Sequence, residues 1–239
     1  MVYVTSDLHG CHPAVLRRLL NKAGFTAKDE LYVLGDVIDR GDHGAQLLLW
    51  MTQQPNVQLL LGNHEALLLA CVFLFEEVTE ESLSRLDAKQ LMVLENWLQN
   101  GGGPTLAGLR RILKRDPDLL EGILEYLQEA PLYECLRVRD RKFVLVHSGL
   151  DNFQPKRPLK DYAPGEVLLA RPGLDTRYFD DALVVFGHTP TAFFGEEFSG
   201  KALKTESWIC IDTGAAMGGM PMLLRLDDMA EFYIDPTEM

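Results

Sequence analysis

Paired cysteines and long apolar runs are both missing from this chain. Its cysteines lie far apart and form no Cys-x-x-Cys pair: Cys11, Cys71, Cys135 and Cys210. That spacing argues against a zinc knuckle and against a disulfide framework, so we expect reduced, mostly buried thiols. The longest uncharged apolar stretch, near Ala66–Phe75, is too short to cross a bilayer. No membrane partner is therefore predicted.

Positive charge is also scarce. The 239 residues contain 23 Lys and Arg against 35 Asp and Glu, which gives a formal net charge of -12. Binding to a nucleic-acid backbone needs clustered basic residues, so nucleic acid is excluded as the main partner. The chain starts Met1-Val2-Tyr3-Val4 without a charged leader, which predicts a cytoplasmic protein. With 47% hydrophobic residues, we expect a single domain over 1–239 with a substantial core.

The first 76 residues alternate between short apolar runs and helical patterns. Strands are predicted at Val2–Ser6, Leu31–Leu34 and Val57–Leu61, and helices at Pro13–Ala23, Ala45–Thr52 and Glu65–Glu76. Three successive strand–loop–helix units predict a parallel sheet, with ligands bound at the carboxyl ends of its strands.

The middle of the chain has helical spacing only. Ser82–Gln99, Thr105–Leu113 and Pro117–Glu129 are predicted helices, and Gly101-Gly102-Gly103-Pro104 separates the first two. This block, about residues 78–130, is interpreted as a helical insertion between two halves of the fold. Two roles for it remain open, namely packing on the core and covering the site as a lid.

Strand patterns return after Pro131. Leu132–Val138 and Phe143–Val146 predict a hairpin, and four more strands follow at Leu183–Phe186, Trp208–Ile211, Met222–Leu226 and Phe232–Ile234. Their short connections suggest antiparallel neighbours. The predicted fold class is α/β, a two-sheet β-sandwich flanked by helices in αββα order, with the helical insertion.

Asp, His and Asn side chains directly follow several predicted strands. The segments are Asp7-Leu8-His9-Gly10, Gly35–Gly41, Gly62-Asn63-His64-Glu65, His147-Ser148, Arg171 and Gly187-His188. Alternate side chains leave a strand end on the same side, so Asp7 and His9 can hold one cation, and the Asp36 carboxylate can bridge two. This oxygen and nitrogen set without thiolates suits manganese, iron or zinc, and two such ions hydrolyse phosphate esters. His12 and His43 lie outside the pattern and are interpreted as ordinary packing residues.

These segments resemble the calcineurin-like metallophosphoesterases, specifically the phosphoprotein phosphatase family in its small bacterial form. The resemblance extends from Ser6-Asp7-Leu8-His9-Gly10 to Gly218-Gly219, and Asp39-Arg40-Gly41 and Asn63-His64-Glu65 are its most specific parts. It implies one metal held by Asp7, His9 and Asp36, and a second held by Asp36, Asn63, His147 and His188.

The resemblance also implies roles in catalysis. His64 would be the general acid and Asp39 would support its imidazolium form, while Arg40, Arg171 and Asn63 would hold the phosphoryl oxygens. An alkoxide leaves poorly without a proton donor, and guanidinium groups match phosphate oxygens, so these residue types suit the roles. Asp42-His43-Gly44 departs from the family pattern, in which a proline and a serine or threonine are common. The shape of this loop and the substrate preference therefore stay open.

Three functions remain in competition. The first is a dimetal phosphomonoesterase, with Mn²⁺ favoured, that removes phosphate from phosphoserine or phosphothreonine by direct attack of metal-activated water. The alternative is a symmetrical bis(5'-nucleosyl)-tetraphosphatase, which shares the Gly-Asp-x-x-x-Arg-Gly frame but usually lacks an aspartate at the position of Asp39. The third, a non-catalytic binding module, would require a broken ligand set. A phosphorylated protein or a small phosphoester is thus the expected partner of a monomeric protein.

Overall fold

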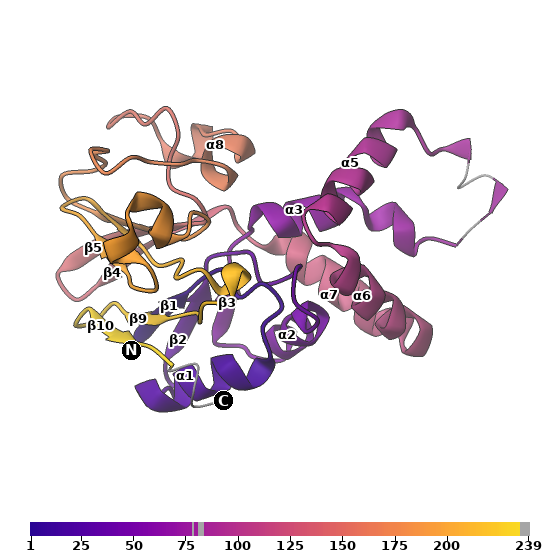
Figure 1. Ribbon diagram of the computed structural model, residues 1–239, viewed down its shortest axis with the longest axis horizontal. Helices are drawn as coiled ribbons and strands as arrows, with labels where there is room; N and C mark the ends of the chain where they lie inside the picture. The colour runs from indigo at the N-terminus through magenta and orange to yellow at the C-terminus, as the bar shows by residue number, and fades with distance from the viewer. Residues whose placement is uncertain (78, 81–83, 235–239) are drawn as a thin grey trace.

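Two five-stranded sheets form the centre of the molecule (Figure 1). The computed structural model describes residues 1–77, 79–80 and 84–234. The first sheet has the strand order β10-β9-β1-β2-β3, with bounds Ala230–Phe232, Leu223–Arg225, Val2–Thr5, Glu30–Val33 and Val57–Leu59. The second has the order β4-β5-β6-β8-β7, with bounds Tyr133–Val138, Arg141–Val146, Leu183–Phe186, Trp208–Cys210 and Leu203–Lys204.

Strand direction follows the length of the connections. In the first sheet β1, β2 and β3 are parallel, as the strand–loop–helix pattern predicts, and β9 is antiparallel to β1. In the second sheet β4 and β5 form the expected antiparallel hairpin. The prediction that the later strands are antiparallel neighbours is wrong for β6, which is parallel to both β5 and β8. Residues 147–182 join β5 to β6, and this segment is long enough for the crossover that a parallel pair requires.

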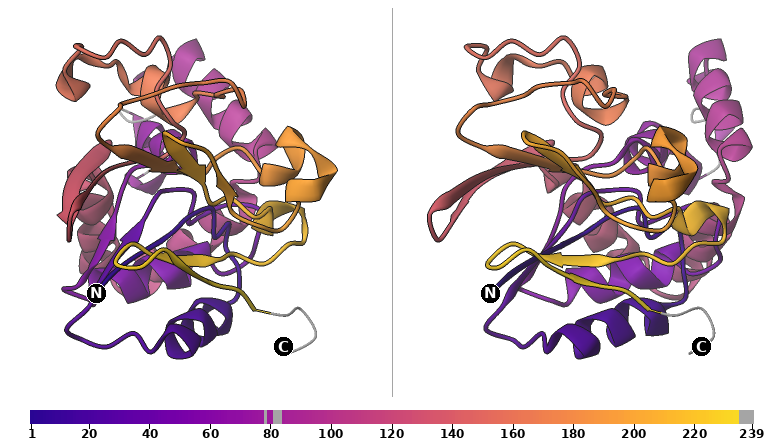
Figure 2. Two further views of the ribbon diagram at one scale, coloured as in Figure 1. Left: turned by 90° about the vertical axis from the view of Figure 1, so that its left-hand side faces the viewer. Right: turned by 60° about the vertical axis from the view of Figure 1, so that its left-hand side comes forward.

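Helices cover the outer faces of both sheets. The α-helices are α1 Pro13–Ala23, α2 Gly44–Thr52, α3 Asn63–Ala70, α5 Ala88–Gln99, α6 Gly103–Arg115, α7 Pro117–Glu129 and α8 Pro164–Leu168. The 3-10 turns are η1 Val72–Phe75, η2 Leu159–Asp161, η3 Thr191–Phe194, η4 Glu196–Phe198 and η5 Ala215–Met217. Figure 2 shows α1 below the first sheet and α8 above the second, so the layers follow the predicted αββα order.

Alternating strand residues divide the interior into three cores. Tyr3 packs with the helices outside the first sheet, whereas its neighbour Val4 packs between the two sheets. In the second sheet Leu145 faces the space between the sheets, and Val144 packs against the layer that contains α8. This period of two is the ordinary geometry of a strand covered on both faces.

The helical insertion contributes to the outer core of the first sheet. Leu109 of α6 and Leu127 of α7 are fully buried in the core that also contains Leu48 of α2. The helix predicted over 82–99 starts later than expected, since residues 85–87 are not helical and α5 begins at Ala88, where the N-cap Asp87 accepts a hydrogen bond from the backbone N–H of Gln90. Residues 82 and 83 lie outside the described residues. Within the described ranges, no helix is long and apolar enough to cross a bilayer.

Two predicted boundaries are corrected by the backbone. The helix expected over Glu65–Glu76 starts at Asn63 and ends at Ala70, because Cys71 leaves the helical region with φ -111° and ψ 15°, and the chain continues as η1. The last strand is β10, two residues earlier than the expected Phe232–Ile234.

Candidate active site

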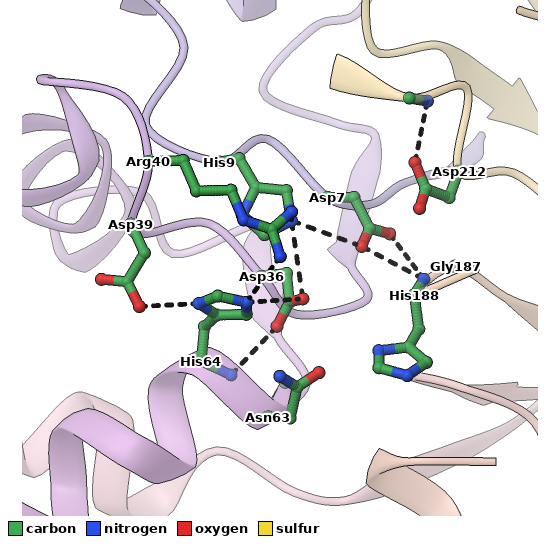
Figure 3. Close-up of polar contacts among 12 residues, drawn as sticks. Asp7, His9, Asp36, Asp39, Arg40, Asn63, His64, Gly187, His188 and Asp212 are labelled. Atoms are coloured by element: carbon green, nitrogen blue, oxygen red, sulfur yellow. Dashed lines mark hydrogen bonds and ion pairs between the residues drawn. The ribbon is translucent and has the colours of Figure 1, made fainter. Parts of the chain in front are cut away.

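The segments that begin at Asp7, Gly35, Gly62 and Gly187 meet at the carboxyl ends of the central strands (Figure 3). Asp7 and His9 follow β1, Asp36 follows β2, His147 follows β5 and His188 follows β6. Backbone hydrogen bonds join the first two loops, since the His9 N–H donates to the Asp36 carbonyl at 2.9 Å. Asp7 and His188, which are 181 residues apart in the sequence, thereby become neighbours.

Left-handed backbone conformations concentrate at this site. Among the described residues, nine non-glycine residues have positive φ, and six of them belong to the site: Asp7, His9, Asp36, Asp39, Arg40 and His188. Each such conformation costs on the order of 1–3 kcal/mol and persists only where surrounding contacts enforce it. The fold therefore holds these side chains in orientations that the isolated loops would not adopt.

Two groups of metal-binding atoms share the Asp36 carboxylate. The first contains His9, Asp36 and His64, and the second contains Asp36, His147 and His188. One Asp36 oxygen lies 3.6 Å from Nε2 of His9, and the other lies 3.5 Å from Nε2 of His147. A carboxylate whose two oxygens face different groups has the geometry of a bridging ligand.

Two further predicted ligands border these groups. Oδ1 of Asn63 lies 2.9 Å from Nε2 of His147, which places this amide at the second group. Asp7 lies at the edge of the first group, with Oδ1 3.9 Å from Nε2 of His9, and its carboxylate also accepts the His188 N–H at 2.9 Å. The third member of the first group is thus His64 and not Asp7, although the resemblance implies that His64 is the general acid and Asp7 a ligand.

The protonation of the imidazoles fits a role as metal ligands. Nδ1 of His147 lies 2.7 Å from the Leu34 carbonyl, and Nδ1 of His9 lies 3.2 Å from the Ile38 carbonyl. A carbonyl at Nδ1 fixes the proton there and leaves the Nε2 lone pair directed into the site. Burial lowers the pKa of His9 to about 3, so this ring is neutral at pH 7.

Several acidic side chains are buried close together at the site. Burial, together with the carboxylates of Asp212 and Asp36, raises the pKa of Asp7 well above its ordinary value. Burial also raises the pKa of Asp212 to about 7. Carboxylates removed from water and placed near each other are stabilised by a cation, so the charge and the donor chemistry both fit divalent metal ions.

His64 lies between the first group and a buried carboxylate. Its Nδ1 is 2.7 Å from Oδ2 of Asp39, and its Nε2 is 3.8 Å from Oδ2 of Asp36. Burial lowers the pKa of His64, but the hydrogen bond to Asp39 and the charges of Asp36, Asp39 and Glu65 outweigh it, so the pKa is raised. Such a histidine retains its proton at Nδ1 and can donate from Nε2.

The two predicted phosphate-binding arginines differ in their surroundings. The Arg40 guanidinium lies 3.0 Å from Nε2 of His9 and 3.2 Å from Nε2 of His64, at the mouth of the site. Arg171 is exposed and makes no hydrogen bond or ion pair with the described part of the chain. Its positive charge nevertheless contributes to lowering the pKa of His188, after burial and His147, so Arg171 lies near the second group.

The side chains of His12 and His43 contact each other. Their rings meet edge to face with centroids 4.6 Å apart. Nδ1 of His12 also accepts the Ala14 N–H and caps α1. Both observations agree with the interpretation of these histidines as packing residues.

Sequence reasoning missed two residues that organise the site. The buried Glu65 carboxylate accepts the N–H groups of Asp36 and Val37, both at 2.8 Å, and thereby shapes the loop after β2. The sequence feature that could have indicated this role is the position of Glu65 in the Asn63-His64-Glu65 triplet at the start of α3, where a glutamate can form a capping box. The second is Trp97, within the predicted helix Ser82–Gln99, which donates its indole N–H to Asp39 at 2.9 Å.

Comparison with known proteins assigns the family. The model of the calcineurin-like phosphoesterase family matches residues 1–202. The chain belongs to that family. This calcineurin-like phosphoesterase is 43% identical over 151 residues to a symmetrical bis(5'-nucleosyl)-tetraphosphatase of Acidovorax ebreus (strain TPSY). The match covers 62% of this chain and 44% of the relative, so the chain matches less than half of that protein's length.

Other comparisons extend over nearly the whole phosphoesterase chain. A symmetrical bis(5'-nucleosyl)-tetraphosphatase of Buchnera aphidicola subsp. Baizongia pistaciae (strain Bp) is 23% identical, with 99% of this chain and 98% of the relative covered. A crystal structure described as a candidate diadenosine tetraphosphatase has a TM-score of 0.65 and 18% identity, covering 98% and 92% of the two chains. A protein serine/threonine phosphatase from Saccharomyces cerevisiae has a TM-score of 0.58 and 13% identity, covering 98% and 80%. The two solved structures confirm the predicted two-sheet fold.

Proposed function

We propose that this phosphoesterase is a two-metal hydrolase of small phosphoric esters and anhydrides, with a dinucleoside tetraphosphate as the first substrate to test. The observation that carries the proposal is the Asp36 carboxylate, whose oxygens face two separate groups of metal-binding atoms. The sequence alone favours a protein serine/threonine phosphatase. The names of the curated relatives give more weight to the alternative, the symmetrical tetraphosphatase.

The residues divide between two ion sites. We assign one ion to Asp7, His9 and Asp36, and the other to Asp36, Asn63, His147 and His188. When bound, a pair of divalent ions, for which Mn²⁺ is our first choice and iron or zinc the alternatives, supplies Lewis acidity and makes water a better nucleophile. The chain contributes rigid donors, because the ligand side chains are held by buried loops.

Substrate binding is assigned to Arg40, Arg171 and Asn63. The exposed Arg40 side chain reaches over His9 and His64, so its guanidinium can turn toward a phosphoryl group at the mouth of the site. Two guanidinium groups match the oxygens of a phosphoryl group and counter the charge that develops on them.

The acid is assigned to His64, supported by Asp39. The 2.7 Å contact at Nδ1 leaves Nε2 as the atom that can donate a proton to the departing oxygen. An alkoxide needs that proton, whereas a nucleoside diphosphate leaves readily without it. The intact pair of His64 and Asp39 is therefore the specific observation that favours the second candidate, a phosphoserine or phosphothreonine phosphatase.

A substrate panel tests the proposal. The Mn²⁺-loaded protein is assayed on a dinucleoside tetraphosphate, a phosphoserine peptide and an aryl phosphate, with Asp36→Asn as the inactive control. The highest kcat/KM on the tetraphosphate, with two nucleoside diphosphates as products, supports the first candidate. The highest value on the phosphopeptide replaces it with the second. Binding of two metal ions without turnover of any of the three substrates contradicts the proposal.

A further inference from the structure

We propose that Trp97 is a positioning residue for the acid. Its indole N–H holds the Asp39 carboxylate against His64, and Gly101 and Thr105, which follow it in the chain, hold the backbone of Asp39 and Arg40. The inference rests on the proposed hydrolase function, since it assigns a support to the proton donor of that reaction. It also gives the helical insertion a role in the site besides its packing role.

The Asp39 carboxylate has few partners. The residue is fully buried, and its Oδ2 accepts hydrogen bonds from Nδ1 of His64 at 2.7 Å and from Nε1 of Trp97 at 2.9 Å. Its other oxygen has no hydrogen-bond partner in the described part of the chain. Trp97 is therefore the one side-chain donor besides His64 in the described ranges, and without it the carboxylate can rotate away from the imidazole.

Two residues that follow Trp97 hold the backbone of Asp39 and Arg40, namely Gly101 between α5 and α6 and Thr105 in the first turn of α6. The Asp39 N–H donates to Oγ1 of Thr105 at 2.9 Å, and the Arg40 N–H donates to the Gly101 carbonyl at 2.9 Å. Asp39 and Arg40 have positive φ, 70° and 68°, a conformation that needs external support. Three hydrogen bonds from one segment of the insertion thus reach the two adjacent residues that orient the acid and bind phosphate.

Trp97 is itself fixed. Its side chain is fully buried, and a Cβ atom placed on Gly102 would lie 2.6 Å from the indole ring. The ring therefore packs directly on a backbone that tolerates no side chain there. A tryptophan needed only for its volume would be replaceable by phenylalanine, whereas one needed for its N–H would not.

Trp97→Phe tests this directly, with Trp208→Phe as the matched control. Trp208 is also fully buried and also donates its indole N–H, in its case to the Thr176 carbonyl at 3.1 Å on the far side of the second sheet. On aryl phosphates with graded leaving groups, we expect Trp97→Phe to lower kcat about tenfold for the poorest leaving group, with KM unchanged. For the best leaving group the loss should stay within about twofold, because little acid assistance is needed there. Trp208→Phe should change kcat by the same factor for all of these substrates.

A measurement on the metal-free protein separates this inference from the proposed function. The NMR signal of the His64 Nδ1 proton should be downfield in the unmodified protein, shift upfield in Trp97→Phe and stay in place in Trp208→Phe. An unchanged signal in Trp97→Phe, or an equal loss of kcat for all leaving groups, overturns the inference while leaving the hydrolase function intact. Absence of turnover in the unmodified protein instead refutes the function, and the proton signal still decides the role of Trp97.

A second pair of variants applies if Trp97→Phe does not fold. Thr105→Val removes the oxygen that accepts the Asp39 N–H, and Thr105→Ser keeps it. We expect Thr105→Val to reproduce the loss for poor leaving groups and the shift of the His64 proton, and Thr105→Ser to restore both. Equal behaviour of the two variants contradicts the proposal.

Discussion

Asp36 is the residue on which both groups of metal-binding atoms depend. Its oxygens face His9 and His147, and its position is set by hydrogen bonds from the loop backbone to Glu65. By contrast, His188 is a member of the second group only, and Asn63 contacts that group through His147. Loss of Asp36 should therefore affect both ions, and loss of a ligand of one group should affect mainly one.

Asp36→Asn is expected to weaken metal binding at both sites by at least about 100-fold, since even partners behind metal ligands contribute 10- to 100-fold. Titration calorimetry with Mn²⁺ measures the effect, and Asp42→Asn is the control. Asp42 is an exposed acid in the same loop that belongs to neither group of the described chain. Two equivalents of Mn²⁺ bound with unchanged affinity in Asp36→Asn would contradict the bridging role.

The pH dependence of kcat should report the pair of His64 and Asp39. His64 must be protonated to act as the acid, and its pKa is raised because the contributions of Asp39 and the other acids outweigh burial. Activity should therefore persist to higher pH than an ordinary histidine, with pKa about 6.5, would allow. In Asp39→Asn the raising contribution is lost, so the alkaline limb should move about 1–2 pH units lower.

A pH–rate profile on an aryl phosphate provides the measurement for Asp39→Asn. The exposed Asp118 of α7 offers a control, because in the described part of the chain its carboxylate makes no ion pair with His64. An alkaline limb that stays in place in Asp39→Asn would show that His64 does not depend on Asp39 for its proton.

At the scale of the elements, the ends of strands and the loops after them decide the geometry of the site. Each site loop leaves a strand at its carboxyl end, and glycines let neighbouring loops approach closely. Gly187, at the end of β6, lies against Asp7 and Ser6 from the end of β1, and a Cβ atom at Gly187 would overlap both side chains. The two sheets meet through this contact, which also allows the His188 N–H to reach Asp7 at 2.9 Å.

Gly187→Ala is thus expected to push Asp7 aside and to lower the free energy of unfolding by about 1–3 kcal/mol, as overpacking does. Urea unfolding followed by circular dichroism measures this, and Mn²⁺ binding should weaken in parallel. Gly122→Ala in α7 is the matched control, because nothing lies within 4 Å of its Cβ position. In a helix this control should be neutral or stabilising by up to about 1 kcal/mol. Equal stability of the two variants would contradict the close approach.

At the scale of the whole molecule, the two sheets share the core between them. Leu145 of β5 and Val4 of β1 are fully buried in it, so neither sheet is packed without the other. If the chain is a single domain over 1–239, as predicted, we therefore expect it to unfold in one cooperative transition.

Leu145→Ala should cost about 2–5 kcal/mol, because it opens a cavity between the sheets. Unfolding in urea should remain a single transition, with far-UV circular dichroism and tryptophan fluorescence coinciding. Leu91→Ala is the control, since Leu91 of α5 is 53% exposed, and its substitution should change stability by less than about 0.5 kcal/mol. Two separate transitions would contradict the single-domain prediction.

Local chemistry in the sequence determined much of this protein. The short apolar runs before Asp7, Asp36 and His147 predict buried strands, and helical spacing with Pro13 and Gly24 marks the ends of α1, so these elements follow from neighbouring residues alone. Oxygen and nitrogen donors placed just after the strands likewise predict a metal-binding edge, since parallel strands end on the same side. The parallel direction of β6 did not follow from its own residues, because it depends on the length of the segment 147–182 that precedes it.

Only the tertiary structure decided the distances between distant segments. It placed the two oxygens of Asp36 toward different histidines, brought His64 into the first group, and set Trp97 against Asp39. The place of His64 in the first group and the contact of Trp97 with Asp39 leave no signal in nearby residues, because each joins positions tens of residues apart through packing and strained backbone. The local sequence determines which side chains follow each strand. The packing of the sheets and of the helical insertion determines which of these side chains are in contact.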